Sequence, residues 1–371
     1  MLQQEGQQAP RCAPEQPLPG QEQGFSSPGA QQAVQPPHPA GGAADVGAPQ
    51  LAPVVVLHGT CGWSDASLVR CGRFYPASVK ASSSSEEKLR HYSRMFATVE
   101  VDTSTYAIPR ADVTARWAQA AAPGFLFHVK SFGLFCSQGC QVSSLPAEAK
   151  SLLQPAQAAS PQAYLRLSAM PPGVEAACWR RFHAALEPLY QAGKLGLVIF
   201  QFHLSFLPSQ QNLQYILRCR AQLDARFRMA VELRCRRWFT DPAWRQQLCK
   251  ALSMQGITLV SADELAHETA QRDREQTGLP PGEVRQVLPI ALEVTTPGCH
   301  YVRIHRRYGT TEKLLPPEEI QAWAVRLEQL APRLQGPIYF LWGTDNADVP
   351  VVNARCDACG AVQCRRPFVR T

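Results

Sequence analysis

The segment that decides the fold spans residues 228–238 and reads RMAVELRCRRW. Apolar and other side chains alternate along its first seven positions, and a repeat of two is the pattern of a β-strand with two different faces. One face carries Met229, Val231 and Leu233, and the other carries Ala230, Glu232 and Arg234. The apolar face suits a covering layer of helices. The second face ends in a carboxylate and a guanidinium, which favours a functional site at the C-terminal end of this strand.

Three other segments repeat this alternation, at residues 98–102, 125–130 and 301–305, and a fourth, at residues 197–201, is wholly apolar until Gln201. Each carries a polar or charged side chain at the C-terminal end of one face. Ligands of α/β proteins bind at the carboxyl ends of the strands, so we expect these side chains to line one pocket. The residues expected there are Glu100, Lys130, Gln201, Glu232, Arg234, Arg303 and His305.

Strand patterns alternate with helical ones along the chain. Further strands are expected at residues 54–57, 257–262 and 337–341, which makes eight in all. The helices are expected at residues 86–96, 111–121, 174–191, 210–223, 242–255 and 317–330, with a last one starting near Pro350. Alternation predicts a parallel sheet with helical crossovers, and eight units favour an α/β fold of the closed (β/α)8 TIM-like type. The alternative, an open doubly wound sheet, calls for a three-glycine nucleotide loop after the first strand, and Gly59 and Gly62 do not have that spacing.

Several segments fall outside the alternation. Residues 1–50 are rich in Gln, Pro, Gly and Ala, which predicts a disordered N-terminal tail. The barrel is expected over residues 51–355, followed by a segment with cysteines and arginines at 356–371. Within the barrel we expect a long loop at residues 131–173, and loops of that length are usually functional or disordered. A charged insertion is expected at residues 265–282.

Eight short motifs, in order along the chain, resemble the YecE-like family, a domain of unknown function with a TIM-like barrel. The motifs are GTCGWS at 59–64, FYP at 74–76, TVE at 98–100 with Tyr106 and Pro109, residues 125–130, FQ at 200–201, VELR at 231–234 with Trp238, YVR at 301–303 with His305, and NA at 353–354. The resemblance implies a barrel with a pocket at its C-terminal mouth, and it implies no particular reaction. Two family positions differ, since His305 is followed by arginine and the last strand ends in Leu341 and Trp342.

The bulk composition limits the setting in which this chain works. Its formal charge of +7 is a mild basic bias that suits anionic ligands and is too weak to diagnose nucleic-acid binding. Thirteen scattered cysteines without a signal-peptide pattern predict free thiols in a reducing, cytoplasmic compartment. No apolar run reaches the ~20 residues that span a bilayer, so no membrane association is expected. No oligomeric state is predicted.

The catalytic candidates are Glu232, Glu100, Lys130 and His305. A carboxylate on the inner face of a barrel is desolvated, which is expected to raise the pKa of Glu232 and of Glu100 into a range useful for proton transfer. The structural alternative is that a cation neutralises each carboxylate, Arg303 or Lys130 in the case of Glu232. Lys130 is expected to hold an anion or, less favoured, to form a Schiff base. His305 is a candidate acid, base or metal ligand, with simple hydrogen bonding as the alternative.

No metal and no cofactor are predicted. A divalent ion bound by Glu100, Glu232, Asp263 and His305 is conceivable, but Lys130 and two arginines nearby would repel it. Cys356, Cys359 and Cys364 offer three thiolates, one fewer than a structural zinc site requires. Reduced thiols are therefore favoured there.

Two functions from different classes remain open. The first is an enzyme that performs acid–base or hydrolytic chemistry on a small anionic or phosphorylated substrate. The residues expected to bind that substrate are Arg234, Arg303, Gln201, Thr60, Trp63 and Tyr106. The second is a non-catalytic binder of nucleic acid or another polyanion, in which the arginines of residues 234–238 contact phosphates and Trp238 stacks on a base.

Overall fold

The structure is a computed structural model that describes residues 54–264, 288–305, 315, 317–343 and 347–355. Eight parallel strands close into a barrel in the order β1-β10-β9-β8-β7-β6-β3-β2. The strands are β1 (Val56–Thr60), β2 (Thr98–Val101), β3 (Leu126–Lys130), β6 (Leu195–Phe202), β7 (Arg228–Leu233), β8 (Thr258–Glu264), β9 (His300–His305) and β10 (Ile338–Trp342). The predicted (β/α)8 fold class is therefore confirmed. The barrel closes where β1 pairs with both β10 and β2.

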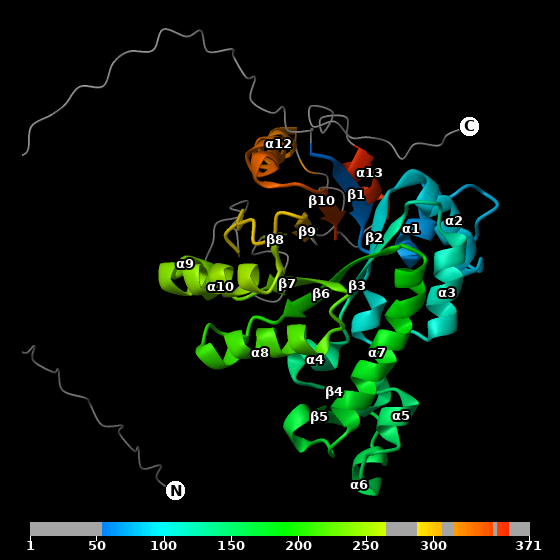
Figure 1. Cartoon of the computed structure of the whole chain (residues 1–371). Helices are drawn as coiled ribbons and strands as arrows, with labels where there is room; N and C mark the ends of the chain where they lie inside the picture. The colour runs from blue at the N-terminus through cyan, green and yellow to red at the C-terminus, as the bar shows by residue number, and fades with distance from the viewer. Residues whose placement is uncertain (1–53, 265–287, 306–314, 316, 344–346, 356–371) are drawn as a thin grey trace, which may run out of the picture. The chain divides into compact units, whose positions relative to one another are not determined.

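The helices cover the outside of the barrel strands (Figure 1). Those that follow the first strands are α1 (Ala66–Arg70), α2 (Ser85–Met95), α3 (Ala111–Ala120) and α7 (Val174–Gln191). Those that follow the later strands are α8 (Gln210–Gln222), α9 (Arg237–Thr240), α10 (Pro242–Met254), α12 (Pro317–Leu330) and α13 (Val349–Arg355). The helical ranges predicted from periodicity agree with these to within a residue or two at most ends, because apolar stripes and caps such as Ser84 mark them clearly.

The two faces of each strand separate as the alternation predicts. Met229, Val231 and Leu233 of β7 are fully buried in the core between the strands and the helices. Ala230 lies instead in a second cluster that fills the barrel interior together with Ile199. Burying a large apolar side chain between the strands and the helices stabilises the fold by about 1.5–3 kcal/mol. The apolar face of each strand therefore turns towards the helices, and the residues that alternate with it point into the barrel.

The long segment between β3 and β6 is the main departure from the prediction. Instead of an extended loop, residues 131–173 form a small excursion with its own two-stranded antiparallel sheet of β4 (Gly139–Gln141) and β5 (Tyr164–Arg166). It also contains α4 (Gly133–Ser137), α5 (Ala147–Lys150) and α6 (Pro155–Ala158), with 3-10 turns η2 (Val142–Ser144) and η3 (Leu167–Ala169). Its buried residues, such as Phe132, Phe135 and Val142, pack into the main core. The expectation of an irregular loop was wrong because these short elements carry no long periodic pattern.

Strand ends also differ from the predicted ones. β1 was expected at residues 54–57 and extends to Thr60. β8 was expected to end at residue 262 and continues through Asp263 to Glu264, which places the Glu264 side chain on the inner face. The remaining short turns are η1 (Thr103–Thr105) and η4 (Ala331–Arg333). The predicted tail at 1–50, the predicted insertion at 265–282 and the C-terminal cysteines lie outside the described residues.

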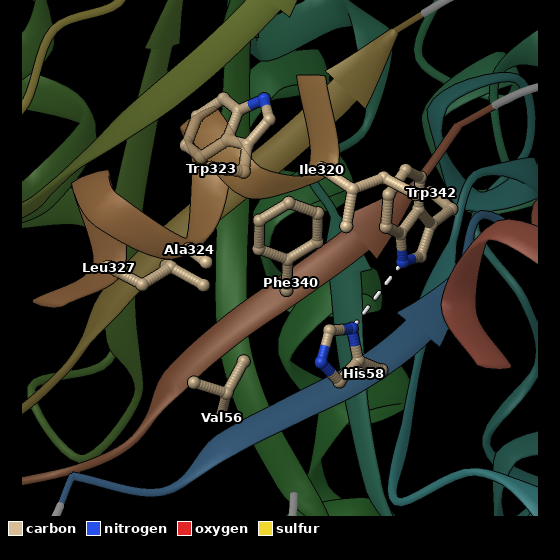
Figure 2. Close-up of a pocket in the computed structure, with 8 residues that line it drawn as sticks. All are labelled: Val56, His58, Ile320, Trp323, Ala324, Leu327, Phe340 and Trp342. Carbon is tan, nitrogen blue, oxygen red and sulfur yellow. Dashed lines mark hydrogen bonds between the residues drawn. The ribbon is translucent and has the colours of Figure 1, made fainter. Parts of the chain in front are cut away.

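A small apolar cavity of about 10 Å³ separates α12 from β1 and β10. Figure 2 shows that His58 of β1 lines this cavity, beside Phe340 and Trp342 of β10 and opposite Trp323 of α12. Trp342 Nε1 donates a 3.5 Å hydrogen bond to His58 Nδ1, and burial lowers the His58 pKa to about 4. His58 is therefore a neutral packing residue between β1 and α12, on the face of β1 opposite to the barrel interior.

In the part of the chain that is described, no helix combines the length and the apolar character needed to cross a bilayer.

Gly59 provides a direct test of how tightly the barrel closes. A Cβ atom added at Gly59 would collide with the backbone carbonyl of Thr98 on the neighbouring strand β2. Because backbone cannot move aside cheaply, we expect Gly59→Ala to lower the free energy of unfolding by about 2 kcal/mol in urea denaturation. Gly298→Ala is the matched control, since a Cβ there meets open space, and its effect should stay within about 0.5 kcal/mol. Equal stability of the two variants would contradict the packing described here.

Candidate functional site

A cavity of about 370 Å³ opens at the carboxyl ends of the barrel strands. We call it the mouth cavity. Its charged, imidazole and amide side chains are Asp102, Lys130, Gln201, His203, Arg234, Glu264, Arg303 and His305. The strand alternation therefore brought five of the predicted residues together. Glu100 and Glu232, the two predicted proton carriers, are fully buried beneath the cavity and are not among the residues that line it.

Arg303 and Glu100 form the floor of the cavity, with Arg303 lining it and Glu100 beneath. The Arg303 side chain is 1% exposed, and its Nε donates a 3.0 Å hydrogen bond to Glu100 Oε1. Tyr301 donates its hydroxyl to Glu100 Oε2 at 2.6 Å. Burial acts to raise the pKa of Glu100, but Arg303 and Lys130 outweigh it and hold that pKa well below its usual range. Glu100 is therefore ionised at neutral pH.

Glu232 is also an ionised, buried carboxylate. Its Oε1 accepts hydrogen bonds from Gln201 Nε2 at 2.6 Å and from Arg234 Nη1 at 2.8 Å. Burial alone would raise the Glu232 pKa, yet Arg303 and Arg234 lower it to about 2. The expectation of raised carboxylate pKa values at these two positions was wrong. Desolvation does act to raise both pKa values, but the cations lie close enough to the two carboxylates to lower them overall.

Lys130 connects the buried layer to the cavity. Its Nζ lies 2.8 Å from Asp102 Oδ1 and 3.5 Å from Glu100 Oε1. It also donates to Gln201 Oε1 at 3.5 Å. Burial and Arg303 act to lower the Lys130 pKa, but the surrounding carboxylates raise it overall. A Schiff-base lysine needs a lowered pKa, so this geometry supports only a protonated, charge-holding Lys130.

Asp102 is the titratable carboxyl group that the strand alternation could have identified and that was not among the predicted site residues. It follows Glu100 by two positions, so it points to the same face, just beyond the end of β2. Its side chain is 28% exposed and lines the mouth cavity. Burial and the neighbouring Glu100 raise the Asp102 pKa to about 7, against the opposing effect of Lys130 and Arg303. Asp102 is the acid of the site that changes charge near neutral pH.

Arg234, Glu264 and His305 form a second group on the cavity wall. Arg234 Nη2 forms an ion pair with Glu264 Oε1, and His305 Nδ1 lies 3.3 Å from that same oxygen and 3.2 Å from Arg234 Nη2. Burial raises the Glu264 pKa, but its contacts with His305 and Arg234 lower it overall. Glu264 was not predicted, because the sequence pattern ended the strand too early. Asp263, considered as a metal ligand, accepts a hydrogen bond from Trp323 Nε1 at 2.9 Å on the helix side of β8.

Two predicted substrate-binding residues do not reach the cavity. The Thr60 hydroxyl donates to Gly62 O at 2.8 Å and also contacts Tyr92 OH, and Thr60 is buried. Trp63 is buried in the outer core, where its Nε1 donates to Ser85 O at 3.0 Å. Tyr106, in contrast, is 74% exposed and lines the mouth cavity, and its contact with a substrate stays a prediction. The strand alternation could not predict which way these two side chains point, because Thr60 is the last residue of β1 and Trp63 follows the strand.

Trp238 does not form a surface for base stacking. It is fully buried, its Nε1 donates to Phe206 O at 2.7 Å, and its ring stacks on Phe206 with centroids 6.2 Å apart. The basic segment that follows β7 therefore has no exposed aromatic at this position. This removes the stacking part of the predicted polyanion-binding site.

The described residues contain one group with metal-ligand geometry. One ligand atom each from Cys61, Glu100 and Asp102 lies within 4.8 Å of the others. Both carboxylates of this group are already in ion pairs with Lys130 and Arg303. A divalent cation would therefore sit beside two fixed positive charges, which opposes its binding. The set of Glu100, Glu232, Asp263 and His305 does not converge, since Asp263 faces the helices.

Comparisons with known proteins agree with this fold. Residues 57–357, from β1 to just beyond α13, match the family described as "Protein of unknown function DUF72". The "UPF0759 protein YunF" of Bacillus subtilis (strain 168) is 27% identical over 254 residues, which cover 68% of this chain and 71% of that protein. A solved DUF72 family protein from Enterococcus faecalis V583 matches with a TM-score of 0.58 at 18% identity, covering 83% of this chain and 95% of that one. One from Thermotoga maritima MSB8 gives a TM-score of 0.53 at 20% identity, covering 81% and 96%.

The lowered pKa of Glu232 predicts a specific loss of stability in acid. A carboxyl group whose pKa falls from 4.5 to about 2 on folding stabilises the fold above pH 4.5, and this contribution disappears as the pH falls towards 2. At 1.36 kcal/mol per pKa unit it amounts to about 3 kcal/mol. We expect Glu232→Gln to be less stable than the parent by about that amount at pH 7, with the difference shrinking between pH 4.5 and pH 3. Urea denaturation across this pH range measures it.

Asp112→Asn is the control for this experiment. Asp112 forms exposed ion pairs with Arg110 and Arg116, which the solvent screens, so its loss should leave the unfolding free energy nearly unchanged at every pH. A constant difference between Glu232→Gln and the parent from pH 7 to pH 3 would contradict the ionised state assigned to Glu232.

Proposed function

We propose that this chain, which belongs to the DUF72 family of proteins of unknown function, is an enzyme that performs acid–base chemistry on a small anionic substrate in the mouth cavity. The observation that carries this proposal is Asp102, a partly exposed carboxyl group with a pKa of about 7, 2.8 Å from the Lys130 ammonium. A carboxyl that keeps its proton up to neutral pH can serve as a general acid where an ordinary aspartate cannot.

In this proposal the roles are divided between two layers. Asp102 exchanges the proton with the substrate, while Lys130 and Arg303 hold the anionic group beside it. Glu100 and Glu232 keep those cations charged and correctly oriented, so they act as positioning residues instead of proton carriers. His305, held by Glu264 and Arg234, is the second group proposed to exchange a proton. Gln201 and Tyr106 complete the contacts to the substrate.

The remaining expectations from the sequence belong to the same proposal. The motifs that resemble the YecE-like family are taken to mark this site, and residues 51–355 are taken as the barrel domain. A reducing, cytoplasmic location fits the cysteines of the described residues, which are free thiols. The alternative of a nucleic-acid binder is less favoured, because Trp238 is buried in the core. Hydrolytic chemistry remains one form that the acid–base step can take.

The test begins with identification of the substrate. Small molecules retained through native purification are identified by mass spectrometry, and a panel of phosphorylated and carboxylated metabolites is assayed for turnover. With that substrate, Asp102→Asn should lower kcat/KM by about 10²–10⁴-fold, because a general acid contributes that much. The parent's kcat/KM should fall as the pH rises through about 7, where Asp102 loses its proton, and Asp102→Asn should lack this limb.

Asp112→Asn serves as the matched control, since it also converts an aspartate to its amide but lies outside the cavity on an exposed helix face. It should keep the parent's rate and pH profile. Turnover by Asp102→Asn at the parent's rate would refute the role of Asp102. Tight, strongly salt-dependent binding of single-stranded DNA or RNA without any turnover would instead favour the polyanion binder.

A further inference from the structure

The ion pairs of the mouth cavity restrict how an anion can enter it. Lys130 Nζ is already 2.8 Å from Asp102 Oδ1, and Arg303 Nη2 is 3.7 Å from Asp102 Oδ2. The Asp102 carboxylate therefore occupies the position beside both cations that an anionic ligand would require. A ligand can approach Lys130 and Arg303 only by coming close to Asp102.

With Asp102 ionised, the carboxylates around this position already outnumber the cations by one, without a ligand. Glu100 and Glu232 are fully buried beneath the cavity, and Glu264 is paired with Arg234 on its wall. Together with Asp102 these are four carboxyl groups, and they face the three cations Lys130, Arg234 and Arg303. An added anion would give this partly desolvated cluster a clear excess of negative charge. Such an excess is costly where water is scarce, unless a proton enters with the anion.

Asp102 is the group best placed to accept that proton. It is faced by Cys61 at the end of β1, Glu100 from β2, Lys130 from β3 and Arg303 from β9. Glu100 and Glu232 each accept a hydrogen bond from an arginine guanidinium and are sealed from the cavity. Asp102 is in contact with the cavity and shares its two cations with Glu100. The thiol of Cys61 is kept in its neutral form by a raised pKa.

We propose that the mouth cavity binds an oxyanion together with one proton, which Asp102 takes up as the anion binds between Lys130 and Arg303. This rests on the proposed anion site and extends it to the proton state of the complex. A negatively charged oxygen of the ligand then takes the place of the Asp102 carboxylate as the partner of Lys130 and Arg303. The protonated Asp102 then donates a hydrogen bond to the bound oxyanion, so Asp102 enters the reaction as an acid.

Sulfate is a suitable probe, because it stays a dianion throughout the range from pH 5.5 to pH 8.5. Binding of sodium sulfate to the full chain is measured by isothermal titration calorimetry in two buffers with different ionisation enthalpies, which gives the number of protons taken up. With a pKa of about 7 in the free protein, Asp102 is ionised at pH 8.5 and already protonated at pH 5.5. We therefore expect uptake of close to one proton per bound sulfate at pH 8.5 and almost none at pH 5.5. The apparent Kd should be about 30-fold larger at pH 8.5 than at pH 6.

Two variants identify the group that accepts the proton. Asp102→Asn should bind sulfate without proton uptake and with an affinity that is nearly independent of pH. Asp112→Asn, the control, should behave like the parent. The parent's own buffer dependence requires no variant, so the inference is tested even if Asp102→Asn folds poorly.

The outcomes separate the inference from the proposed function. Sulfate binding without proton uptake, and with a constant Kd from pH 6 to pH 8.5, overturns the inference and leaves the anion site standing. Proton uptake that persists in Asp102→Asn also overturns it, because another group of the cavity would then be the acceptor, and His305→Gln and His203→Gln tell the two histidines apart. Absence of sulfate binding even at pH 5.5 overturns both the inference and the anion site of the proposed function.

Discussion

The guanidinium of Arg303, buried inside a closed barrel, is the interaction on which the rest of this site depends. Arg303 comes from β9 but pairs with Glu100 on β2 and Glu232 on β7, neither of which neighbours β9 in the barrel. A charge this deeply buried is tolerated only when opposite charges and hydrogen bonds compensate it, and removing one partner typically costs about 3–5 kcal/mol. The three side chains therefore stabilise one another and fix the floor on which the mouth cavity is built.

This arrangement explains why the most buried carboxylates are not the titrating ones. Desolvation acts to raise the pKa of Glu100, Glu232 and Asp102 alike. The first two have a guanidinium within hydrogen-bond distance, and its attraction exceeds the desolvation cost. Asp102 shares Lys130 and Arg303 with Glu100, and the like charge of Glu100 adds to the effect of burial. Which acid titrates is thus decided by how the cations are divided among the acids.

The sequence contained most of the fold and part of the site. A repeat of two along each strand fixes which residues face inward, and this was enough to bring Lys130, Gln201, Arg234, Arg303 and His305 to one cavity. It could not show how deep each side chain lies, because depth depends on the tilt and register of the strands in the closed barrel. Glu100 and Glu232 were therefore interpreted as proton carriers, and Asp102, one step further along the same face, was overlooked. The excursion at residues 131–173 escaped prediction because short elements stabilised by tertiary packing leave little local signal.

The central claim, that Asp102 carries the titrating proton while Glu100 and Glu232 remain ionised, is tested most directly by carbon-13 NMR. The side-chain carboxyl carbons of all aspartates and glutamates are labelled in the full chain and followed from pH 3 to pH 9. The account predicts a carboxyl resonance with a midpoint near pH 7 that is absent from Asp102→Asn. A resonance with a midpoint between pH 5 and pH 8 that persists in Asp102→Asn and vanishes in Glu232→Gln or Glu100→Gln would contradict it.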